Sequence, residues 1–233
     1  MLREAAAVLT AAPAANDTWM DRTMLADLQV QLANCILLRT DGRGDCTEAR
    51  ELLSSACALL AELARDHPEN ADYPINLGGA WNNLAALANQ QGEHAAAASC
   101  ADAAIATQQA ALALVPENRR ARTFLGMHYG QLAFARAHLG DDAAAIAAVE
   151  QAIARAPRHT MTLRLAAEAA TLVAARAADG GEAAADARLA VAALEKMAAV
   201  NAQEARRWCE DARFAALRGR TDFELLRRPG GQK

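Results

Sequence analysis

Histidine, cysteine and acidic residues are the side chains of this sequence that could hold a metal ion or take part in catalysis. The histidines do not occur in the H-E-x-x-H or E-x-x-H spacing that sets two metal ligands on one face of a helix. They are His67, His94, His128, His138 and His159. The sequence also contains no glycine-rich phosphate loop, no G-x-S-x-G and no kinase catalytic signature. We therefore expect a protein that is not an enzyme, with no metal site and no cofactor.

The cysteines are odd in number, and no two of them form a C-x-x-C pair. They are Cys35, Cys46, Cys57, Cys100 and Cys209. This pattern favours neither a disulfide framework nor a zinc site. We expect small, buried, reduced thiols instead.

The first 15 residues, MLREAAAVLTAAPAA, have the outline of a short signal peptide, with one arginine and an Ala-x-Ala-like end. However, Glu4 follows Arg3 directly, and the apolar stretch is mostly alanine, which is weakly hydrophobic. We prefer an amphipathic helix over residues 2–12. Together with the reduced thiols, this interpretation predicts a cytoplasmic protein.

Composition favours an all-helical protein. Hydrophobic residues make up 53% of the chain but aromatic residues only 4%, so the apolar content is mainly alanine and leucine, which are strong helix formers. The 28 acidic and 24 basic residues are spread along the chain and leave a net charge of -4, which argues against a nucleic-acid partner. No run approaches the roughly 18 consecutive apolar residues of a membrane span, so we expect no membrane partner.

Glycine and proline, which mark turns and helix ends, recur at regular intervals. Five of the six intervals between the markers are 24 residues, and the interval that ends at Pro157 is 17. The markers are Gly44, Pro68, Gly92, Pro116, Gly140, Pro157 and Gly181. Apolar residues recur between them at three- and four-residue spacing, as a buried helix face requires. The pattern predicts antiparallel helices over 16–40, 46–66, 72–91, 93–114, 118–139, 141–156, 159–178, 182–200, 203–217 and 221–227.

The segment that begins at Trp81 resembles the tetratricopeptide repeat, whose pattern is W-x2-L-G-x2-Y, then A-x3-F, then P. Trp81–Ala85 match the first helix of that pattern, which recurs 48 residues later at Tyr129–Ala133. Ala145, Val149 and Pro157 fit the second helix and its terminator. The stretch between alanine and proline is seven residues longer in the earlier unit, which equals two helical turns. The chain therefore resembles the elongated-helix variety of this family.

The resemblance implies a superhelical array of antiparallel helix pairs, an α-solenoid, over residues 15–200. Residues 1–14 would form a half-repeat or capping helix, and residues 201–233 capping helices and a tail. That tail is similar to the closing segment of bacterial serine/threonine protein kinases that contain such repeats. Aromatic residues at the helix starts, Trp19, Tyr73 and Trp81, should pack in the core, and Trp208 should hold the last helix on the array.

Arrays of this family bind peptides or partner helices in a concave groove that is lined by the first helix of each pair. The two aligned units predict a groove lined by Asn82, Asn83, Ala86, Asn89, Gln90, Met127, Gln131, Phe134 and His138. Amide side chains there could bond a peptide backbone through both donor and acceptor groups, and Phe134 could supply an apolar anchor. A solvated helix face without a ligand is the alternative interpretation of the same residues.

These observations lead to a main hypothesis and two alternatives for the function. The main hypothesis is a non-catalytic protein-protein interaction scaffold that binds a peptide or partner helix in the groove. The first alternative is the regulatory C-terminal portion of a larger signalling enzyme such as a bacterial serine/threonine kinase. The second is a homo-oligomer that associates through its end helices.

Overall fold

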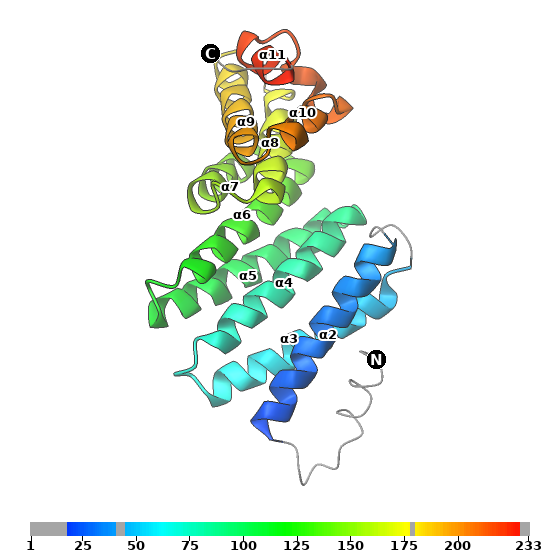
Figure 1. Cartoon of the computed structure of the whole chain (residues 1–233), viewed down its shortest axis with the longest axis vertical. Coiled ribbons are helices and arrows are strands. Elements are labelled where there is room, and N and C mark those ends of the chain that lie inside the picture. Colours follow the sequence, from blue (N-terminus) through cyan, green and yellow to red (C-terminus); the bar gives the residue numbers. More distant parts are fainter. Residues whose placement is uncertain (1–17, 41–44, 178–179, 229–233) are drawn as a thin grey trace. The chain divides into compact units, whose positions relative to one another are not determined.

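The computed structural model describes residues 18–40, 45–177 and 180–228 of the chain. Within these ranges every regular element is a helix, and no strand occurs (Figure 1). The predicted all-helical fold class is therefore confirmed. The helix expected over residues 2–12 lies outside the described residues.

The helices begin and end close to the positions that glycine and proline predicted. They are α2 (Trp19–Thr40), α3 (Thr47–Asp66), α4 (Asp72–Gln90), α5 (His94–Leu114), α6 (Arg119–Leu139), α7 (Asp142–Arg155), α8 (Thr160–Ala174), α9 (Gly180–Val200), α10 (Ala202–Cys209) and α11 (Thr221–Arg227), with a 3-10 helix η2 at Ala212–Leu217. Local backbone constraints at the connectors thus determine most of the helix boundaries.

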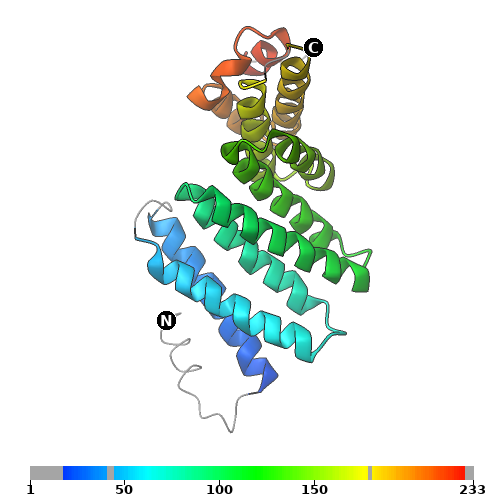
Figure 2. The ribbon, with the colours of Figure 1, turned by 180° about the vertical axis from the view of Figure 1, so that it is seen from behind.

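The chain divides into two compact units, residues 1–121 and 122–233. In the first unit, α2 packs against α3, α3 against α4 and α4 against α5, each pair antiparallel, as both views of the ribbon show (Figures 1 and 2). In the second unit, α7, α8 and α9 pack in the same sequential way. The short elements η2, α10 and α11 then cover α8 and α9. Sequential antiparallel packing is the arrangement of a helical repeat array.

The glycine turns after α4 and α6 have the same geometry, 48 residues apart. Gly92 has φ 77° and Gly140 has φ 79°, a region that glycine enters without steric cost. The N–H of Glu93 donates to the carbonyl of Ala88 over 2.8 Å, and the N–H of Asp141 donates to that of Arg136 over 3.0 Å. Both bonds are the 6→1 bond of a Schellman motif, which ends a helix.

The proline connectors form a second repeated turn. Asn70, Asn118 and His159 each stand two residues after the proline, and each donates its backbone N–H to a carbonyl three residues earlier over 3.0 to 3.1 Å. The side chains of Asn118 and His159 then cap the following helix, and Oδ1 of Asn70 accepts a hydrogen bond from the N–H of Asp72, the first residue of α4. The Oδ1 atom of Asn118, for example, accepts a hydrogen bond from the N–H of Ala121 at 3.0 Å. The repeat that the sequence predicted is thus present in the backbone geometry.

The core of the first unit contains leucine and alanine from α2, α3 and α4. Tyr73, at the start of α4, is buried in it, and Trp81, in the middle of α4, packs against it half-buried, so both aromatic residues contribute to the core as expected. The expectation for Trp19 was wrong, since its side chain is 51% exposed. Its ring contacts that of His67, with the centroids 6.1 Å apart.

The core of the second unit extends into the C-terminal segment. Phe214, Leu217 and Phe223 are fully buried in the same cluster as the residues of α7, α8 and α9, and Trp208 packs against them. These side chains complete the apolar face that α8 and α9 would otherwise expose. Trp208 thus contributes to the contact between the C-terminal segment and the core of the second unit.

The single helix expected over residues 203–217 was wrong. The α-helix ends at Cys209, and Asp211 takes an extended conformation with φ -66° and ψ 142°. Its side chain accepts a hydrogen bond from the N–H of Arg213 at 2.9 Å and so caps η2. Aspartate favours such a cap over a helix interior, because its carboxylate competes for nearby backbone N–H groups.

The helix α6 approaches the α7–α8 connector more closely than a side chain would allow. A Cβ atom at Gly126 would lie 2.7 Å from the Cβ of Ala156 and 2.8 Å from its nitrogen. One at Gly130 would lie 3.1 Å from the Cγ2 of Thr162. Backbone packing therefore excludes a side chain at Gly126, whereas at Gly130 the methyl group of Thr162 on α8 would have to move by a few tenths of an ångström.

Candidate functional site

One face of α4 remains accessible to solvent. Most of the other α4 side chains are buried, but five residues on this face are not. Gln90 is exposed, and four residues are half-buried: Asn76, Gly79, Asn83 and Ala86. Their spacing of three and four residues places them in one line along the helix. Amide side chains occur at every seventh residue of this line, and the positions between them carry glycine or alanine. We call these five residues the amide face.

The amide face is continuous with α2 in the same unit. The Nδ2 atom of Asn83 donates a hydrogen bond to the Oδ1 atom of Asn34 at 3.1 Å. This bond fixes the orientation of the Asn83 amide and leaves its own oxygen available. Asn76 and Gln90 make no side-chain hydrogen bond within the part of the chain that the structure describes. Their donors and acceptors are therefore open to a ligand.

The sequence prediction identified part of this face. Asn83, Ala86 and Gln90 lie on it, but Asn82 and Asn89 are buried, each 8% exposed. The Oδ1 atom of Asn89 lies 3.2 Å from Nδ1 of His94, at the turn into α5. Sequence reasoning missed Asn76 and Gly79. The seven-residue period of Asn76, Asn83 and Gln90 was the signal that could have identified them.

In the second unit, the four residues predicted on α6 share one face. Met127, Gln131 and Phe134 are half-buried, and His138 is exposed. The Phe134 and His138 rings stack at a tilt of 50° with their centroids 4.5 Å apart. This pair presents an aromatic surface one helical turn long. The face is more apolar than the amide face of α4.

A charged cluster that the sequence analysis did not predict joins α8 to the C-terminal segment. The Oε1 atom of Glu168 accepts hydrogen bonds from Arg164 and from Arg213, the latter with 2.9 Å between Oε1 and the guanidinium nitrogen. The Glu168 side chain is only 4% exposed. Burial raises the pKa of the Glu168 carboxyl, although the positive charges of Arg164 and Arg213 act in the opposite direction.

Both arginines of this cluster also contact the ring of Trp208. The guanidinium carbon of Arg164 is 4.8 Å from the centroid of the indole ring, and that of Arg213 is 4.9 Å away. Both distances are within the range of a cation–π interaction. Asp211 also bonds Arg213, at 2.8 Å, and hydrogen bonds from Arg213 lower the pKa of Asp211 to about 2. The cluster positions η2 on α8, which is a structural role.

The thiols were predicted to be uniformly buried, and this was wrong for two of them. Cys35 is exposed and Cys100 is half-buried, while Cys46, Cys57 and Cys209 are buried as expected. All five are free. Burial raises the pKa of Cys57 to about 12, so this thiol stays protonated at neutral pH.

Within the described ranges, no three histidine, cysteine or acidic side chains are grouped so that they could hold a metal ion. Over the same residues, none of the helices is both long enough and apolar enough to cross a membrane. No family model matches the chain, and no curated protein matches it. The fold therefore defines the class of the protein, an all-helical array of sequential antiparallel helix pairs.

Proposed function

We propose that the protein is a non-catalytic interaction scaffold of the tetratricopeptide-repeat kind, which binds an extended peptide segment of a partner protein on the first helices of its pairs. The proposal is supported by the repeated connectors, which end α4 and α6 with the same turn geometry. In such arrays each repeat contacts its neighbours, and the remaining faces form extended binding surfaces.

The amide face of α4 is the observation that carries this proposal. Its amides are seven residues apart, which corresponds to about 10 Å along a helix. An extended chain rises about 3.3 Å per residue, so every third peptide group of a bound segment would meet an amide. Each amide offers both a donor and an acceptor, which is what a peptide group requires.

The small residues between the amides support the same reading. No heavy atom lies within 4 Å of the position that a Cβ would take at Gly79, so the surface there is open. Ala86 presents only a methyl group. A peptide backbone can therefore approach α4 closely between the amide side chains, as hydrogen bonding at about 3 Å requires.

A capture experiment tests the proposal. The full chain is used as bait in lysate of its source cell, beside an Asn76→Ala/Gln90→Ala variant and a Gln109→Ala/Gln203→Ala control. The control removes two exposed amides outside the amide face, on α5 and α10. Proteins recovered by the wild type and the control but lost with Asn76→Ala/Gln90→Ala would support the proposal. Equal recovery by all three baits would refute it.

A further inference from the structure

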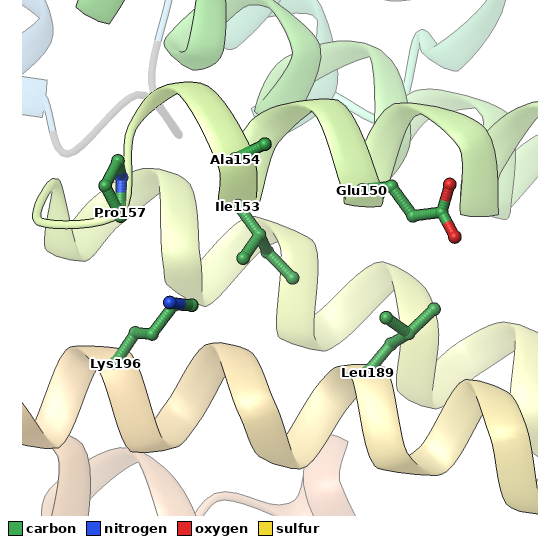
Figure 3. A pocket seen from close by; sticks show the side chains of 6 residues that line it. All are labelled: Glu150, Ile153, Ala154, Pro157, Leu189 and Lys196. Carbon is green, nitrogen blue, oxygen red and sulfur yellow. The ribbon is translucent and has the colours of Figure 1, made fainter.

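A shallow cavity of about 430 Å³ lies between α7 and α9, in the second unit. It is lined by Glu150, Ile153, Ala154, Pro157, Leu189 and Lys196. Figure 3 shows Ile153 and Leu189 between the two helices, with Glu150 towards one end of the cavity and Lys196 towards the other. The cavity is thus an apolar groove with a negative and a positive end.

The groove runs along the last turns of α7, which is a short helix. This helix has 14 residues, whereas α5 and α9 have 21 each, and the difference is the same seven residues by which the interval before Pro157 is shortened. Leu189 lies opposite Glu150, and Lys196 lies opposite Pro157 (Figure 3). The last residues of α9, after Lys196, therefore continue past the end of α7.

The charged residues of the groove are available to a ligand. Glu150 and Lys196 are both exposed, and neither makes an ion pair or hydrogen bond within the described part of the chain. Lys196 is also the one lysine among the described residues of a chain that has 22 arginines. The reactivity of its side-chain amine can therefore be used as a chemical probe of the groove.

We propose that this groove docks an amphipathic helix of a partner protein that lies parallel to α7 and α9. A basic residue of that helix would meet Glu150, and an acidic residue seven positions later would meet Lys196. Glu150 and Pro157 are seven residues apart, and so are Leu189 and Lys196, which is about 10 Å of helix in each case. Aliphatic residues at the third and fourth positions between the charges would pack on Ile153 and Leu189.

Charge complementarity also sets the direction of the docked helix. The positive end of a helix dipole is its N-terminus, so this end belongs beside Glu150 and the C-terminus beside Lys196. This site is independent of the amide face, which lies on α4 in the other unit. The two surfaces can therefore be tested separately.

The test uses two synthetic alanine-based helices with a fluorescent label, titrated into the full chain and followed by anisotropy. The matched peptide carries Arg, two Leu and Glu at positions i, i+3, i+4 and i+7, and the exchanged peptide has Glu and Arg swapped. We expect the matched peptide to bind at least about threefold more tightly, because the exchanged peptide either meets two repulsions or lies in the opposite direction with its helix dipole unfavourably placed. It should also protect the Lys196 amine from acylation, as read by mass spectrometry.

Two variants make the result specific to the groove. Glu150→Lys/Lys196→Glu should reverse the preference between the peptides, and Ala154→Gln, which fills the groove without adding charge, should weaken both. All three positions are exposed, so helix content should not change. Absence of binding to the wild type, or a preference that the charge reversal leaves unchanged, would overturn the proposal. Concentration-dependent self-association that Ala154→Gln abolishes would also overturn it, because the occupant would then be a second copy of the chain.

Discussion

At the scale of single residues, two helical glycines differ in the space around the position that a Cβ would take. Gly126 faces Ala156 at a distance that excludes a Cβ, whereas nothing lies within 4 Å of the Cβ position of Gly79. An alanine substitution at Gly126 therefore tests the packing contact, whereas the same substitution at Gly79 tests helix propensity without a packing contact. The sequence alone shows both as glycines in a helix and cannot distinguish them.

We predict that Gly126→Ala lowers the free energy of unfolding by about 1–3 kcal/mol, because the added methyl group overpacks the contact with Ala156. Gly79→Ala should raise it by up to about 1 kcal/mol, because alanine is the better helix former and meets no neighbour. Urea denaturation followed by circular dichroism measures both. Two changes of the same sign would contradict the packing described for α6.

The buried carboxylate of Glu168 gives a second prediction. Glu168→Ala should destabilise the protein by about 3 kcal/mol, because it leaves the guanidinium of Arg164 buried without its charged partner. The estimate is at the low end of the usual range, since Arg213 is 46% exposed and keeps its bond to Asp211. Glu195→Ala, which removes an exposed carboxylate of α9, should change stability by less than about 0.5 kcal/mol and serves as the control.

Asp211 and Glu168 predict pH dependences of opposite sign. The pKa of Asp211 is lowered from 3.8 to about 2, so its contribution to stability is present above pH 3.8 and is lost as the pH falls towards 2. The pKa of the Glu168 carboxyl is raised in the folded protein. Its contribution to stability is therefore present below pH 4.5, the pKa of the unfolded state, and is lost as the pH rises through the pKa of the folded state.

We therefore expect Asp211→Asn to flatten the fall in melting temperature between about pH 4 and pH 2. Melting curves of wild type and variant at half-unit pH steps measure this. An unchanged slope over that interval would mean that the bond between Arg213 and Asp211 does not persist in solution.

At the scale of helices, the sequence predicted ends better than faces. Glycine and proline act on the backbone within one or two residues, so Gly92, Pro116 and Gly140 determined helix ends without knowledge of packing. A face depends on which neighbours cover it. Asn82 and Asn83 are adjacent in sequence, yet only Asn83 is accessible, because about 100° of helical rotation separates them.

The repeated turns yield a prediction at this scale. Gly92→Ala and Gly140→Ala should each cost about 1 kcal/mol, because both residues have positive φ while no atom lies near the added methyl group. The two costs should agree within a few tenths of a kcal/mol, because the turns are equivalent. Gly180→Ala, at the start of α9, meets no neighbour and has no positive φ, so it should be close to neutral.

At the scale of the whole molecule, the sequence predicted an all-helical array with a repeated unit, and the helices of both units have that arrangement. The C-terminal segment was less predictable. Its break at Asp211 and the buried Glu168 depend on contacts between α8 and residues more than 40 positions away, which no local pattern encodes. The amide face was predictable only in part. The seven-residue spacing of its amides indicates a surface only when the structure shows which side of α4 is accessible to solvent.

The measurement that tests the central claim most directly is the affinity of a captured partner's segment for the amide face. The segment, made as a synthetic peptide, is titrated calorimetrically into the wild type, Asn76→Ala/Gln90→Ala and Gln109→Ala/Gln203→Ala. Loss of two amides that each contribute about 1 kcal/mol should weaken binding about thirtyfold in the first variant and leave the control unchanged. Equal affinity for all three proteins would contradict the claim that the amide face of α4 binds the peptide.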